Sequence, residues 1–146
     1  MAVRDVEKDI ENAVKAVLEA QIDADGIMGV TFGTLTGGAP GEEPQKPYVF
    51  IACRPLNYKG GGTDQWDGEL SIDIHTQHLT SYDRDATGLV EIMGSVAYAL
   101  DYGDFSASTE RVGAVNLRRT GGSYDFDKSH NIATIDVTII KACNSK

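Results

Sequence analysis

The chain is 146 residues long and 41% hydrophobic, and its 13 Lys and Arg stand against 22 Asp and Glu, for a formal net charge of −9. This length and composition predict one globular domain, residues 1–146, that folds without a cofactor. The acidic charge repels phosphate and disfavours a protein that reads DNA sequence, and the charged residues mixed into positions 1–20 predict neither a signal peptide nor a membrane span.

An amphipathic helix is predicted over residues 3–21. Acidic residues, among them Glu7 and Glu11, are assigned to its solvent face. Residues 23–26 end the helix, because Gly26 tolerates the left-handed geometry that commonly closes one. The apolar positions that define the buried face are Val6, Ile10, Ala13, Val14, Val17 and Leu18.

Three segments of different character follow this helix. Residues 27–35 favour a strand, and residues 36–47, rich in Gly and Pro, favour an exposed loop. Residues 48–53 are continuously apolar and lie between Pro47 and Pro55. Such a run predicts a strand that is covered on both faces.

The middle of the chain predicts a hairpin tip, a half-buried strand and a second helix. Glycines at 60–62 mark the tip, and residues 67–77 alternate between apolar and polar side chains, as in a strand with one wet face. Ser81 suits a helix start, and the apolar stripe that follows it ends near Tyr102.

The last third predicts a hairpin, with strands at 112–120 and 132–143 and a polar, Gly-rich turn at 121–131. The element order is therefore α-β-β-β-α-β-β. A curved, mainly antiparallel sheet packed by two helices would bury both apolar stripes, so we expect a single-domain α+β fold.

The residues that bear chemistry predict no catalytic or metal centre. His75 and His78 are three apart, so on an extended strand they point to opposite faces and cannot ligate one ion. Cys53 and Cys143 are expected to be core thiols rather than a disulfide or metal pair. The run of glycines at 60–62 leads into a strand, unlike a phosphate-binding loop, which opens a helix.

Two other classes of function stay open. One is a small acid- and His-dependent hydrolase that uses Asp73, His75 and His130. The other is a soluble module that binds a small ligand between helix and sheet. Metal uptake would favour the first, and thermal stabilisation by metabolites the second.

Aromatic residues beside turns and a tight pair of arginines suggest protein contacts instead. Aromatic and Arg side chains are enriched at the buried centres of protein interfaces. The candidate interface residues are Tyr58, Trp66, Arg118, Arg119, Tyr124 and Phe126.

The layout of the chain resembles the small tail-terminator and tail-completion proteins of long-tailed bacteriophages. The resemblance covers most of the chain and rests on element order and residue character. Besides the amino-terminal helix, it lies in YVFIAC at 48–53, GELSIDIH at 68–75, YDRDA at 82–86, DFDKSH at 125–130 and NIATIDVT at 131–138.

The resemblance implies a structural subunit of the virion, made in the bacterial cytoplasm and located in the tail or neck. It implies a homo-hexameric ring that caps the tail-tube protein and meets a head-completion (neck) protein, with no catalysis, no metal and no membrane. DNA would pass through the lumen without specific binding, which agrees with an acidic chain. Mobile loops would help each subunit to reach its neighbour in the ring.

Overall fold

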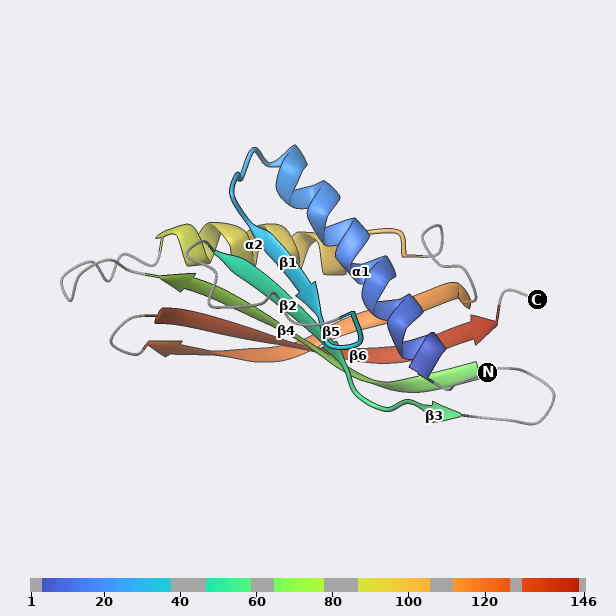
Figure 1. Cartoon of the computed structure of the whole chain (residues 1–146). Helices are drawn as coiled ribbons and strands as arrows, with labels where there is room; N and C mark the ends of the chain where they lie inside the picture. The colour runs from blue at the N-terminus through green and yellow to red at the C-terminus, as the bar shows by residue number, and fades with distance from the viewer. Residues whose placement is uncertain are drawn as a thin grey trace.

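The computed structural model shows one twisted sheet with two helices on the same face (Figure 1). It describes residues 4–37, 47–58, 65–77, 87–105, 112–126 and 130–144. Within this part of the chain, six strands form the sheet in the order β1-β2-β4-β6-β5, with β3 paired to β4 beside that path. The elements are α1 (Arg4–Ala24), β1 (Thr31–Thr34), β2 (Tyr48–Cys53), β3 (Asn57–Tyr58), β4 (Gln65–Gln77), α2 (Thr87–Tyr102), β5 (Val112–Phe126) and β6 (His130–Asn144).

The predicted α+β class and element order are confirmed, and the structure adds the two-residue strand β3. β1 and β2 run parallel, with Thr34 opposite Ile51 at their last paired position. The other strand pairs are antiparallel. β5 lies at the edge of the sheet, and its outer side has no strand partner within the residues that the structure describes.

The apolar core lies between the helices and the side of the sheet that faces them. The centre of this layer is a row of three isoleucines across β2, β4 and β6, because Ile51 and Ile135 both pair with Ile72. All three are almost completely buried. At the far end of α1, the Ser95 hydroxyl of α2 donates a 2.7 Å hydrogen bond to Asp25, and this bond lowers the pKa of the Asp25 carboxyl.

The first helix and the first strand differ from the structure in extent. α1 continues to Ala24 and is closed by Gly26, which adopts a positive φ of 74°. The strand predicted at 27–35 is confined to β1, and residues 38–46, most of the predicted loop, lie outside the described part of the chain.

β2 has the predicted bounds, but the prediction that both its faces are covered is wrong. Val49, Ile51 and Cys53 are buried, whereas the residues between them are only partly buried. Both helices lie on one side of the sheet (Figure 1), so the other side of β2 has no second layer over it among the described residues. This uncovered side is called the open face below.

The predicted turn at 121–131 is also wrong, since β5 runs on through Gly121 and Gly122 to Phe126. The ladder between β5 and β6 shifts register between Arg119 and Gly121, which marks a β-bulge. The glycines that suggested a turn thus lie at or just after this bulge, within a long strand. Gly122 lies beyond this bulge, where the backbone of β6 passes very close to it.

Replacing Gly122 by Ala should destabilise the fold by about 2–3 kcal/mol, because the new Cβ would overlap the backbone carbonyl of Thr134. Urea unfolding measures the loss. Gly121→Ala is the matched control, since a Cβ at Gly121 meets open space, and its effect should stay within about 0.5 kcal/mol. Equal losses for the two variants would contradict this account of the close approach.

Candidate functional site

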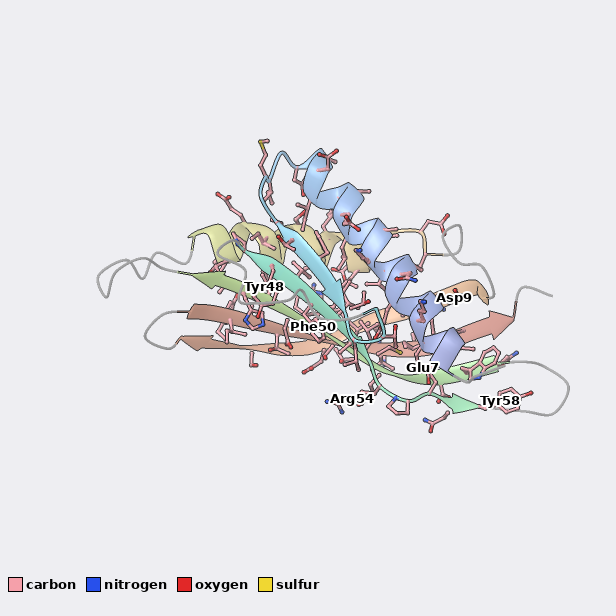
Figure 2. All side chains as sticks on the ribbon, viewed as in Figure 1. Glu7, Asp9, Tyr48, Phe50, Arg54 and Tyr58 are labelled. Atoms are coloured by element: carbon pink, nitrogen blue, oxygen red, sulfur yellow. The ribbon has the colours of Figure 1, made fainter. Side chains whose placement is uncertain are left out.

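Two of the acidic side chains that α1 buries, Glu7 and Glu11, were predicted to face solvent. Glu11 is fully buried, and its carboxylate accepts hydrogen bonds from the Thr36 amide at 3.0 Å, the Thr36 hydroxyl and the Cys53 amide at 2.8 Å. Glu7 is 6% exposed and accepts from the Leu56 amide at 3.4 Å, while its Oε2 has no partner within the described residues. Figure 2 shows Glu7 directed from α1 toward the sheet.

The reason for this burial lies in the helix geometry and in the end of β1. Residues seven apart lie on nearly the same side of a helix, so Glu11 shares a face with Leu18, and Glu7 with Val14. β1 ends at Thr34, and the Cys53 amide lies beyond the part of β2 that pairs with β1. The Glu11 carboxylate accepts the hydrogen bond of the Cys53 amide, which a longer β1 would otherwise have accepted. The buried acids therefore stabilise the fold.

Cys53 is a buried thiol, as predicted, while the side chain of Cys143 lies outside the described part of the chain. Desolvation raises the pKa of the Cys53 thiol to about 12, and the nearby charges of Glu11 and Glu7 add to the rise. The thiol is therefore neutral at physiological pH and a poor nucleophile.

In a Cys143→Ser background, Cys53 should react with a disulfide reagent at pH 8 at least about a hundredfold more slowly in the folded than in the urea-unfolded chain. Because its pKa is raised above the ordinary 9.0, the stability gained from the neutral thiol is complete below pH 9 and is lost between pH 9 and about 12. Rapid labelling of the native chain would contradict this assignment.

The residues of the hydrolase alternative do not assemble around a reacting centre in the described part of the chain. His75 stacks flat on Tyr48, with ring centroids 4.2 Å apart, and Asp73 accepts a 2.9 Å hydrogen bond from the Thr134 hydroxyl. The side chain of His130 and the whole of His78 lie outside the described residues. Among those that are described, no three His, Cys, Asp or Glu side chains group as metal ligands.

Two of the predicted interface residues lie together at the end of β4. Tyr58 on β3 pairs with Trp66 on β4, and their rings are 5.5 Å apart. Tyr58 is 57% exposed, whereas Trp66 is partly buried and packs against the core. The pair therefore anchors β3 and presents one tyrosine face to solvent (Figure 2).

The two arginines that looked like one basic patch point to opposite sides of β5. Arg119 binds Asp101 of α2 through two hydrogen bonds of 2.9 and 3.3 Å on the helix side, and the Asp101 carboxylate raises its pKa. Arg118 lines a hollow on the open face and makes no hydrogen bond or ion pair with the described residues. Of the two, only Arg118 therefore lacks an acidic partner within the described part of the chain.

Tyr124 and Phe126, both predicted to lie in a turn, are part of β5. Tyr124 lies on the helix side and is half exposed, and its hydroxyl donates to Sδ of Met93 in α2. The side chain of Phe126 lies outside the described part of the chain. The five candidate residues whose side chains are described therefore do not form one patch.

The open face has a hollow of about 530 Å³ where β3, β4, β5 and β6 meet. Arg54 and Glu69 form an exposed ion pair of 3.2 Å at its rim, and Figure 2 shows Arg54 directed away from α1. Arg118 and Ile140 also line this hollow, and Ile140 is 45% exposed. Such a shallow, polar and apolar surface suits contact with another protein better than capture of a small ligand.

A second exposed surface was missed by the sequence analysis. Tyr98 and Tyr102 lie on the outer side of α2 with their rings 4.9 Å apart, and they are 55% and 75% exposed. Their i, i+4 spacing was the available signal. The apolar stripe of this helix was assigned only to the core, so its outer side was not considered.

No protein-family model matches the chain, and no curated protein matches it. Among solved structures, it is similar to the sheath/tube terminator of an extracellular contractile injection system, named PVC, in the extended state. The TM-score is 0.39 and the sequence identity 12%, over 95% of this chain. The match spans 56% of the other protein's length. Within the described residues, no helix has the length and apolar character needed to cross a membrane.

Proposed function

We propose that the chain is a structural subunit of a phage-like tail, a terminator that forms a ring on the end of the tail tube and joins it to a head-completion protein. It assembles with copies of itself, as a hexamer in the family that it resembles, and has no catalytic activity. The ring belongs to the tail or neck of the virion.

The open face of the sheet is the observation that carries this proposal. A sheet packed by helices on one side only leaves a broad second side, here with the hollow around Arg118 and the exposed Ile140. Exposed tyrosines on α2 add a further surface, and a ring needs two different surfaces on each subunit.

The charge of the chain also suits a ring through which DNA passes. A ring of subunits that each carry a net charge of −9 repels a polyanion as a whole, which suits DNA that slides without binding. It also keeps unassembled subunits soluble. The solved structure described above is likewise a terminator, but a likeness at its TM-score does not carry the proposal.

Electron microscopy of tail tubes tests this function. Preassembled tubes of the tail-tube protein encoded near this chain are mixed with the purified protein, tagged at its carboxyl terminus for gold labelling. Gold at one end of each tube is the expected result. Label spread along the tube, or no binding at any concentration, would contradict the terminator role.

A further inference from the structure

α2 differs from an ordinary surface helix because its outer side is apolar. Val90, Tyr98 and Tyr102 are 54%, 55% and 75% exposed, and with Gly94 they follow each other at every fourth position. A helix on the surface of a monomer normally carries charged and polar residues on this side. The row of these four residues is called the α2 stripe.

Gly94 is the second unusual feature of the α2 stripe. It lies in the interior of a helix, where Gly is a poor helix former. Its φ is not positive, and an added Cβ would meet nothing within 4 Å. Nothing in the described part of the subunit therefore requires a glycine here, whereas close approach of another protein surface would.

The α2 stripe also carries little charge in a strongly acidic chain. Asp101 beside it is neutralised by the 2.9 Å ion pair with Arg119. Glu91 is exposed and makes no hydrogen bond or ion pair with the described residues. Two copies of a chain with a net charge of −9 repel each other. This repulsion is smallest where a weakly charged surface of one copy meets a cation of the other copy that has no acidic partner within the described residues.

The open face offers that cation. Arg118 lines the hollow of about 530 Å³, and Ile140 beside it is 45% exposed. The α2 stripe and this hollow thus differ in shape. Besides Arg118, the hollow is lined by Asp67 and by Arg54 and Glu69, which pair with each other, so Arg118 is the cation there that Glu91 can meet. They lie on opposite sides of the sheet, so both can be occupied at once.

We infer that the α2 stripe of one copy packs against the open face of a second copy, with the tyrosine pair in the hollow and Glu91 near Arg118. This contact is head-to-tail, and such contacts close into a ring when the rotation between subunits allows it. The inference rests on the proposed function for the ring but concerns a contact between copies that can be measured without a tail tube.

Gly94→Gln separates folding from assembly. Gln is the better helix former, so the melting temperature of the dilute subunit should rise by about 2–4 °C. The added side chain should weaken self-association by about tenfold or more, measured by sedimentation velocity. Glu19→Gln, at an exposed position of α1, should leave association unchanged.

Mixed cysteine cross-linking tests which surfaces meet. In a Cys143→Ser background, Tyr98→Cys and Ile140→Cys proteins are mixed and mildly oxidised, and a disulfide between the two different variants is expected. Dimers of the Tyr98→Cys protein alone, or no cross-link in the mixture, would overturn the inference.

Failure of this inference is distinguishable from failure of the proposed function. If the unmodified chain assembles and Gly94→Gln assembles equally well, the α2 contact is wrong while the ring stands. A chain that stays monomeric at about 100 μM, far above the dissociation constants of most specific complexes, also overturns the inference. Tube binding then decides the proposed function separately.

Discussion

Replacing Glu11 by Ala should lower the free energy of unfolding by about 3 kcal/mol. Its carboxylate accepts from the backbone amides of Thr36 and Cys53. Removing it leaves these donors without their acceptor next to the core, at about 1–3 kcal/mol for each unsatisfied buried group. Urea titration monitored by circular dichroism measures the change.

The conservative Glu11→Gln variant should lose less, because its amide oxygen keeps one acceptor while its NH2 group faces the second donor. Glu19→Ala, which removes an exposed carboxylate from the same helix, is the matched control and should change stability by no more than about 0.5 kcal/mol. If Glu11→Ala cost as little as this control, the carboxylate would not be what holds the ends of β1 and β2 together.

Ile72→Ala should destabilise the chain by about 3–4 kcal/mol, within the range for deleting a fully buried aliphatic side chain. Ile72 lies on the central strand β4 between Ile51 and Ile135, and the cavity would open in the middle of this rigid row. Thermal and urea unfolding should both report the loss.

Ser71→Ala provides the comparison on the open face of the same strand. Its side chain is partly exposed and makes no hydrogen bond or ion pair with the described residues, so the change should be within about 0.5 kcal/mol. A large loss at Ser71 together with a small one at Ile72 would place the core on the wrong side of the sheet.

The sequence predicted those parts of the fold in which local pattern and tertiary packing agree. The alternation in β4 placed Leu70, Ile72 and Ile74 in the core, where the structure has them. The two prolines around β2 marked its ends correctly, at Tyr48 and Cys53. Long periodic segments carry this information because one whole face must be buried.

Glu7 and Glu11 show where the prediction failed. Acidic side chains are almost never fully buried unless they are paired, so both were assigned to solvent. Their seven-residue spacing to Val14 and Leu18 was visible, but the unpaired backbone amides that they satisfy exist only once β1 and β2 have come together. A tertiary feature of this kind leaves no local signal.

The side of the sheet on which each candidate interface residue lies was also not given by local pattern. Arg118 and Arg119 are adjacent, so on a strand they had to point to opposite sides, and only the topology shows that the side of Arg119 is occupied by Asp101. Tyr124 was assigned to a turn, since Gly121 and Gly122 are typical turn residues. In the structure they accompany a bulge within a long strand.

The measurement that tests the account most directly is native mass spectrometry of the purified chain, alone and mixed with the tail-tube protein encoded near it. We predict a closed assembly of six subunits in at least one of these conditions, and loss of that species in the Gly94→Gln variant. A chain that remains monomeric in both conditions would contradict the account of a ring-forming tail terminator.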